Sequence, residues 1–176
     1  MKEFKEHIIF TTNRLIVRQY TELDRDNFFS LSGNENVMQY IRPVSNREKS
    51  DRFLAEYIAA YKENPYSGRW AVIEKATGAF IGSFAIIPMP SQSEKMQLGY
   101  SLTEQNWGRG FATELTRKGL AYFFETHEHK EICGITETLN LASQKVSLKA
   151  GFQAAGSFME EGKELLMFVY KKTYST

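Results

Sequence analysis

The sequence predicts a mixed α/β fold, a central and mostly antiparallel sheet of about seven strands with helices on both faces. The first observation is the order of segments with strand-like or helix-like hydrophobic spacing: strand, two helices, three strands, helix, strand, helix and two strands. The second is that short turn-forming segments join several of the strands directly, as in antiparallel hairpins. The chain has 176 residues, of which 42% are hydrophobic, and this is enough for one sizeable core. We therefore expect a single domain over residues 1–176.

The expected strands are rich in β-branched and aromatic residues and are bounded by turn-forming residues. In chain order they cover residues 14–19, 69–75, 79–87, 95–102, 131–139, 152–158 and 163–170. Ala76 to Gly78 and Glu160 to Gly162 have the spacing of hairpin turns. Pro88 to Ser93 is expected to form a loop between two strands. Cys133 lies in the middle of a strand and is expected to be a small core residue.

The first two expected helices are bounded by capping residues. The first begins with a capping-box pattern at Thr21 and ends at Gly33. The second is expected to begin at Ser45, because Glu48 follows three residues later, and to end before the Asn-Pro pair at 64–65.

The third and fourth expected helices lie in the second half of the chain. The third runs from Ala112 to near His127 and has one apolar stripe that can cover a sheet. That stripe consists of Ala112, Leu115, Thr116, Gly119, Leu120 and Phe123. The fourth follows Asn140 and ends at Gly151, and the adjacent Phe152 is expected to be a core aromatic.

Composition excludes several function classes. Lys and Arg number 22 and Asp and Glu number 21, giving a net charge of +1, so bulk charge predicts no attraction to nucleic acid or to an anionic membrane. The single cysteine and three scattered histidines predict neither an internal disulfide nor a metal site. Residues 1–10 contain too short an apolar run for a signal peptide, and no later stretch approaches the roughly 20 apolar residues of a spanning helix. We expect a soluble, cytoplasmic protein.

The segment with the strongest chemical signal is Trp107 to Ala112 (WGRGFA), which joins a strand to a helix. Gly108 and Gly110 allow the backbone to approach a ligand closely, and the helix N-terminus attracts anions. The pattern lacks the Lys-Ser/Thr of a Walker loop and the third glycine of a dinucleotide fingerprint. A phosphate cradle and a tight turn that serves geometry alone both remain open for this segment.

A second informative segment runs from Asn140 to Phe152 (NLASQKVSLKAGF). Asn140 ends a strand, and Ser143 lies in the short helix that follows. Asn is a favoured N-cap and Gly151 a favoured helix stop, so capping alone accounts for most of the pattern. The local sequence therefore leaves a ligand-binding role for this helix open.

Together, these segments resemble the GNAT superfamily of acetyl-CoA-dependent N-acetyltransferases, and more closely the branch of ribosomal-protein N-terminal (alanine/serine) acetyltransferases. The resemblance covers nearly the whole chain. It rests on residues 12–18 (TNRLIVR), 79–83 (AFIGS), 98–100 (LGY), 107–114 (WGRGFATE) and 140–152. It implies a GNAT-like fold and an enzyme that transfers the acetyl group of acetyl-CoA, as cosubstrate and without a metal, to a primary amine in a ternary complex. The alternative is an acyl-CoA-binding regulatory module with little or no catalysis.

The resemblance also implies which residues hold coenzyme A. The main chain of Tyr100, Ser101 and Leu102 would hydrogen-bond the pantetheine, and Asn140 would hold the same arm together with neighbouring Ser143. The residues expected to wrap the pyrophosphate are Trp107, Gly108, Arg109, Gly110, Phe111, Ala112 and Thr113.

Acyl transfer to an amine requires an oxyanion donor and a proton for the departing thiolate. A main-chain N–H of Tyr100 or Leu102 can stabilise the oxyanion. Ser147 stands where many GNAT enzymes have a tyrosine, and Ser143 matches a serine common in this branch, so either hydroxyl is a candidate proton donor. We favour Ser143.

The general base is not evident from the sequence. Gln97 stands where this branch commonly has Glu, and an amide cannot act as a base. Glu94, Glu104 and Glu137 are substitute candidates. The alternative is that the site binds and orients an already neutral amine without a dedicated base.

The acceptor site is expected near the two N-terminal helices. Most aromatic residues of this region should be core, although a few could line the acceptor site; they are Tyr57, Tyr61, Tyr66 and Trp70. Glu35 and Glu56 are candidate partners for a cationic amine. The acceptor classes considered are a protein N-terminus, a polyamine or an aminoglycoside-like amine, and the protein is expected to be a monomer or homodimer.

Overall fold

A computed structural model describes residues 7–90 and 92–173 of the chain. Residues 1–6 lie outside the described residues; they belong to the N-terminal stretch whose apolar run is expected to be too short for a signal peptide. Ser91, in the expected 88–93 loop, also lies outside the described residues. Within the described residues, no helix is long and apolar enough to cross a membrane.

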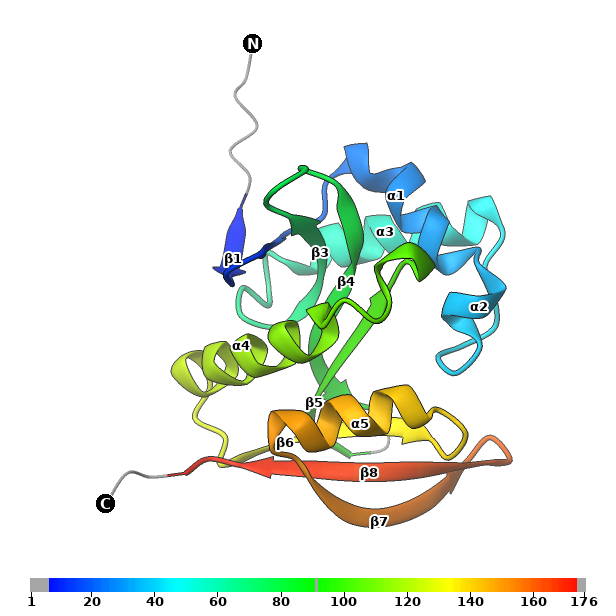
Figure 1. Cartoon of the computed structure of the whole chain (residues 1–176). Coiled ribbons are helices and arrows are strands. Elements are labelled where there is room, and N and C mark those ends of the chain that lie inside the picture. Colours follow the sequence, from blue (N-terminus) through cyan, green and yellow to red (C-terminus); the bar gives the residue numbers. More distant parts are fainter. Residues whose placement is uncertain (1–6, 91, 174–176) are drawn as a thin grey trace.

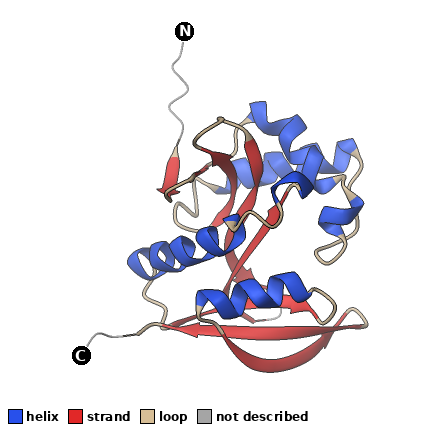
Figure 2. Cartoon of the chain, viewed as in Figure 1, coloured by secondary structure: helices blue, strands red, loops and turns tan. Residues whose placement is uncertain are grey.

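The described residues form a sheet of eight strands in the order β1-β2-β3-β4-β5-β6-β8-β7. The strands are β1 (Ile8–Thr11), β2 (Leu15–Arg18), β3 (Gly68–Glu74), β4 (Phe80–Met89), β5 (Gln92–Leu102), β6 (Glu131–Glu137), β7 (Gln153–Glu160) and β8 (Lys163–Lys171). The helices are η1 (Glu22–Asp24), α1 (Arg25–Ser32), α2 (Glu35–Met38), α3 (Arg47–Ala60), η2 (Glu104–Asn106), α4 (Phe111–Thr126) and α5 (Leu141–Ala150). Figure 2 shows the strands flanked by two groups of helices.

Every neighbouring pair of strands is antiparallel except β5 and β6, which are parallel. This confirms the predicted mixed, mostly antiparallel sheet. The strand that the sequence did not predict is β1, a four-residue edge strand paired with β2. Only Phe10 of β1 is buried, so the segment has neither the length nor the alternation by which a strand is recognised.

The N-terminal helices differ from the prediction in two places. The one-turn helix α2 was not predicted; Asn34 caps it by accepting a hydrogen bond from the Val37 N–H. The second predicted helix, α3, has Asn46 rather than Ser45 as its N-cap, and the Asn46 side chain accepts from the Lys49 N–H at 2.9 Å. Ser45 is instead buried. Either residue type is a good cap, so the sequence alone could not decide between adjacent positions.

The predicted loop at 88–93 is shorter than expected. Strand β4 continues through Pro88 to Met89 and β5 already begins at Gln92, with a shift of register between Pro88 and Met89. Proline in a strand is confined to edges and irregular positions, and the register shift at this end of the hairpin provides one.

The core lies on both faces of the sheet, as predicted. Trp70 and Val72 of β3 pack in the cluster that includes Leu115 and Phe123 of α4, whereas Ala71 packs with the α1 and α3 side chains. This alternation follows from the two-residue period of a strand. The predicted apolar stripe of α4 is buried except for Ala112, which is partly buried. The core positions of Phe152 and Cys133 are also confirmed.

Candidate functional site

Strands β5 and β6 diverge next to the start of α4. The two strands pair at Gln97 and Cys133, whereas β5 stays paired with β4 as far as Leu102. Figure 1 shows β5 running away from β6 at a wide angle. In the described part of the chain, residues 98–102 therefore have no strand partner on the β6 side. The main-chain groups along this edge of β5 are available to a ligand, apart from the Leu102 carbonyl, which accepts a hydrogen bond from Trp107 Nε1 at 2.8 Å.

The glycine turn starts α4 without a side-chain cap. Gly108 and Gly110 have φ of +71° and +79°, and Gly110 is the N-cap. Helices α2, α3 and α5 each use an asparagine side chain to accept a first-turn N–H, whereas α1, which directly follows η1, has no side-chain cap either. The first-turn N–H groups of α4 lack such an acceptor, so the positive end of its dipole is open to an anion.

Hydrogen bonds from two arginine side chains hold the glycine turn in place. Arg109 donates to Glu74 Oε1 and to Asn106 Oδ1, both at 2.6 Å, and hydrogen bonds from Thr77 and Arg109 hold the pKa of Glu74 below its ordinary value. Arg14 donates to the Arg109 carbonyl at 2.9 Å. Because its guanidinium is paired with Glu74, the part of Arg109 that faces a ligand at the turn is its main chain.

Helix α5 is bounded as the sequence predicts. Asn140 Oδ1 accepts from the Ser143 N–H at 3.1 Å, and Gly151 ends the helix in the left-handed conformation at φ +98°. No residue of α5 is buried, in contrast to α4, with which it is in contact. Figure 1 shows the two helices side by side. The Ser143 side chain is accordingly only partly buried.

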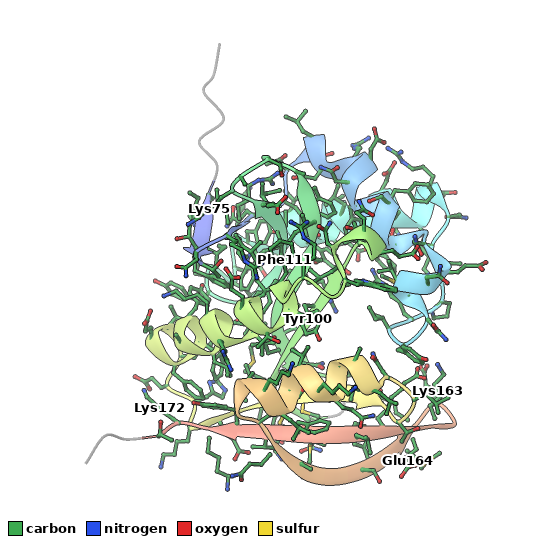
Figure 3. All side chains as sticks on the ribbon, in the orientation of Figure 1. Lys75, Tyr100, Phe111, Lys163, Glu164 and Lys172 are labelled. Atoms are coloured by element: carbon green, nitrogen blue, oxygen red, sulfur yellow. The ribbon has the colours of Figure 1, made fainter. Side chains whose placement is uncertain are left out.

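The structure brings together two of the predicted catalytic residues. Tyr100 lies between α4 and α5 in Figure 3, and its hydroxyl is close enough to the Ser143 side chain for the two to interact. Burial raises the pKa of Tyr100, and the interaction with Ser143 lowers it by less, so the phenol is protonated at neutral pH. Ser147 lies one turn further along α5, where its Oγ is 3.8 Å from the point that a Cβ added to Gly134 of β6 would occupy. It is therefore placed over β6 rather than at Tyr100.

Two of the three candidate bases form hydrogen bonds or ion pairs with other residues, and the third is exposed. Glu104 accepts from the side-chain amides of Asn34 and Asn36 at 2.8 and 2.9 Å. Glu137 is paired with Lys163 at 2.6 Å, and Glu94 is exposed.

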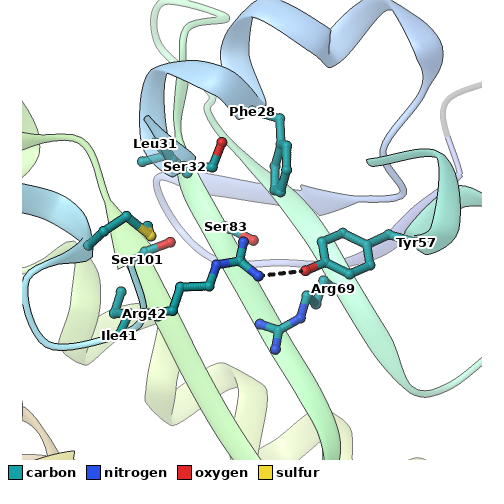
Figure 4. Close-up of a pocket in the computed structure, with 10 residues that line it drawn as sticks. Phe28, Leu31, Ser32, Ile41, Arg42, Tyr57, Arg69, Ser83 and Ser101 are labelled. Atoms are coloured by element: carbon teal, nitrogen blue, oxygen red, sulfur yellow. Dashed lines mark hydrogen bonds between the residues drawn. The ribbon is translucent and has the colours of Figure 1, made fainter. Parts of the chain in front are cut away.

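A cavity of about 120 Å³ opens on the opposite face of the sheet, between α1, α3 and strands β3 to β5. Figure 4 shows the polar side chains around it. They are Ser32, Arg42, Tyr57, Arg69, Ser83 and Ser101. Ser101 follows Tyr100 in β5, so the two side chains point to opposite faces of the strand. The cavity and the open edge of β5 therefore both lie at the C-terminal end of β5.

Most of the predicted acceptor residues lie outside this cavity. Of the four aromatic candidates only Tyr57 lines it; Trp70 is core, Tyr61 is largely buried and Tyr66 is exposed. Neither Glu35 nor Glu56 lines the cavity.

Arg42 and Arg69, which do line the cavity, were not identified in the sequence analysis. The alternation of β3 places Arg69 on the face opposite Trp70. This alternation is the signal in the sequence by which Arg69 could have been identified.

A parallel strand pair that opens beside an uncapped helix start, on a mixed sheet, defines this chain as an acetyl-CoA-dependent acyltransferase of the GNAT type. The acetyltransferase (GNAT) domain profile matches residues 14–153, and the chain belongs to this family. It is 29% identical over 150 residues to the uncharacterized N-acetyltransferase YoaA of Bacillus subtilis (strain 168), covering 84% of each chain.

Solved structures show the same fold. The GNAT-family acetyltransferase from Bacillus anthracis superposes with a TM-score of 0.80 at 18% identity, covering 92% of this chain and 96% of that one. RimL, a ribosomal L7/L12 alpha-N-protein acetyltransferase in complex with coenzyme A, gives a TM-score of 0.78 at 15% identity, with 94% and 98% covered. The predicted GNAT fold is therefore confirmed.

Proposed function

We propose that this protein transfers the acetyl group of acetyl-CoA to a primary amine by direct attack in a ternary complex. The observation that carries the proposal is the uncapped N-terminus of α4, opened by two glycines with positive φ beside the free edge of β5. The turn offers main-chain N–H groups to a pyrophosphate, and the strand edge offers peptide groups to the amide-containing pantetheine arm.

The proposed binding mode uses main-chain groups for most contacts. Residues 107–113 surround the pyrophosphate, and the main chain of Tyr100, Ser101 and Leu102 meets the pantetheine. Asn140 has its Oδ1 committed to capping α5, so its Nδ2 amide is the group that would hold the arm.

The reaction begins with an amine that has lost its proton to water, because ordinary amines have a pKa near 10. Its lone pair forms the new C–N bond at the thioester carbonyl carbon, and a main-chain N–H of Tyr100 or Leu102 stabilises the oxyanion. The C–S bond then breaks, and the excess amine proton leaves to water. The thiolate takes a proton from the Ser143 hydroxyl, Ser143 takes one from the neighbouring Tyr100 hydroxyl, and water returns a proton to Tyr100.

Gly108→Ala is expected to weaken coenzyme A binding about tenfold, because its Cβ and a shifted turn would occupy the phosphate cradle. Gly78→Ala is a matched control: Gly78 and Gly108 have φ of +70° and +71°, and a Cβ at either meets nothing within 4 Å. Both variants should lose about 1 kcal/mol of stability from left-handed strain. Calorimetric titration with coenzyme A and urea unfolding measure the two effects.

Equal affinity of the two variants for coenzyme A would remove the glycine turn from the binding site. A loss of affinity in Gly108→Ala alone would support the cradle, since the strain is common to both variants.

Ser143→Ala and Tyr100→Phe are each expected to lower kcat about tenfold with little change in KM for acetyl-CoA, because both interrupt one proton path. The double variant should be no slower than the slower single variant, since groups that act as a unit are non-additive. Ser147→Ala, one turn along α5, should change kcat less than twofold. Additive losses, or a larger loss in Ser147→Ala, would reassign the proton donor.

A second candidate function is an acyl-CoA-binding module without turnover. It is favoured by Gln97 at the usual position of a carboxylate and by the cavity lining, which contains no carboxylate. Tight coenzyme A binding without acetyl-CoA consumption across carboxylated, phosphorylated and neutral amines would support it over the enzyme.

A further inference from the structure

The cavity beside Ser101 carries two positive charges and is lined by no acidic residue. Neither Arg42 nor Arg69 lies within 4 Å of a carboxylate oxygen in residues 7–90 and 92–173. Among the other arginines, Arg52 and Arg117 are exposed and also have no ion pair within the described residues, and the remaining five are each ion-paired: Arg14, Arg18, Arg25, Arg47 and Arg109. Two neighbouring guanidinium groups without a counter-charge, in a half-enclosed space, favour the binding of an anion.

Aromatic rings hold both guanidinium groups in place. Arg42 lies over the Phe53 ring at 4.7 Å and donates from Nη1 to the Tyr57 hydroxyl at 3.2 Å. Arg69 lies over the Tyr57 ring at 5.4 Å. Stacking on a ring face leaves the in-plane N–H groups of a guanidinium available. Figure 4 shows the two groups on either side of the Tyr57 hydroxyl.

One of these nitrogens is already buried without a partner. Arg42 Nε has no hydrogen-bond acceptor among the described residues, and a buried donor left unsatisfied costs about 1–3 kcal/mol. An anionic oxygen in the cavity would accept from it. The Tyr57 hydroxyl, which accepts from Arg42, keeps its own proton to donate to the same ligand.

We propose that Arg42 and Arg69 bind an anionic group, a carboxylate or a phosphate, on the amine acceptor. This inference rests on the proposed function, because it places the acceptor against Ser101, directly after Tyr100 in β5. A cavity of about 120 Å³ takes the acidic group and a few further atoms. The same charges disfavour polyamines and aminoglycosides, whose additional ammonium groups would be repelled.

The kinetic test compares acceptors that differ in charge alone: β-alanine with β-alaninamide, and O-phosphoethanolamine with ethanolamine. The wild-type protein is expected to prefer the anionic member by at least tenfold in kcat/KM, and the preferred pair identifies carboxylate or phosphate. Arg42→Gln and Arg69→Gln should each reduce the preference about tenfold, while Arg52→Gln, an exposed arginine of α3 outside the cavity, should retain it. An unchanged preference in both cavity variants, or equal use of neutral acceptors by the wild type, would overturn the proposal.

An equilibrium test separates this proposal from the acetyltransferase activity. Acetate and inorganic phosphate are titrated into protein saturated with coenzyme A, which occupies the α4 cradle. The double variant Arg42→Gln/Arg69→Gln should bind the preferred anion at least tenfold more weakly than Arg52→Gln does. If no amine is acetylated but this difference holds, the proposed function fails and the anion site stands. If acetylation occurs and the anion affinities are equal, the anion site fails.

Discussion

Gly82→Ala is expected to destabilise the folded protein by about 3 kcal/mol and to remove most acetyl transfer. Gly82 lies on β4 opposite Leu102 of β5. A Cβ at this position would overlap the main-chain oxygen of Ser101 and approach the Leu102 Cα to 3.0 Å. Because these are backbone atoms, the end of β5 must move, and that strand end carries both the proposed pantetheine contacts and one wall of the proposed acceptor cavity. Urea unfolding and acetyl-CoA turnover measure the two losses.

Gly99→Ala is the matched control for stability. Gly99 lies on β5 and pairs with Ala85 of the same β4 strand, but a Cβ there meets nothing within 4 Å. Its replacement should leave the free energy of unfolding unchanged or raise it slightly, since alanine in a strand loses less conformational entropy than glycine. A similar loss in both variants would show that glycine flexibility, rather than close strand approach, governs Gly82.

The features that the sequence predicted correctly depend on neighbouring residues. The glycine turn before α4, the Asn140 cap and the Gly151 stop follow from local rules about glycine and asparagine. The apolar stripe of α4 follows from helical spacing. These local signals were enough to locate the segments on which the GNAT resemblance rests, and the fold followed from it.

The features that were missed depend on contacts between distant segments. Arg42 lies in the loop after α2 and Arg69 at the start of β3, and only the packing of α1 and α3 on the sheet brings them to one cavity. Glu35 and Glu56 were reasonable partners for an amine by charge alone, but the fold turns them away from that cavity. The main chain of Tyr100 and the hydroxyl of Ser143 were proposed separately, and the proximity of their two side chains is a product of the tertiary structure.

The buried ion pair between Arg18 and Asp24 should make stability strongly dependent on acid pH. Arg18 donates twice to the Asp24 carboxylate, at 2.8 and 2.9 Å, and both residues are more than nine-tenths buried. Burial alone raises the pKa of Asp24, but hydrogen bonds from Arg18 and the Thr21 N–H lower it by more, so the net pKa is below its ordinary value. The unfolded chain therefore takes up this proton at higher pH than the folded one. The stabilisation is complete above the unfolded pKa of about 3.9 and is lost as the pH falls through the lower folded pKa.

Asp24→Asn is expected to lose about 3 kcal/mol at pH 7, because it removes the negative charge to which the buried Arg18 guanidinium donates two hydrogen bonds. As the pH falls through the unfolded and then the lower folded pKa of Asp24, the wild-type carboxylate also becomes protonated, so the difference between the two proteins should shrink. Urea unfolding of both proteins at pH 7, 4 and 2.5 gives that difference, in which the titration of all other carboxylates cancels. A difference that stays constant over this range would mean that Asp24 does not carry the acid sensitivity. A shrinking difference would establish that the ionised Asp24 carboxylate, through Arg18, stabilises the packing of η1 and α1 against β2. Residues of α1 line the cavity that we propose for the acceptor, so this ion pair also supports one wall of that cavity.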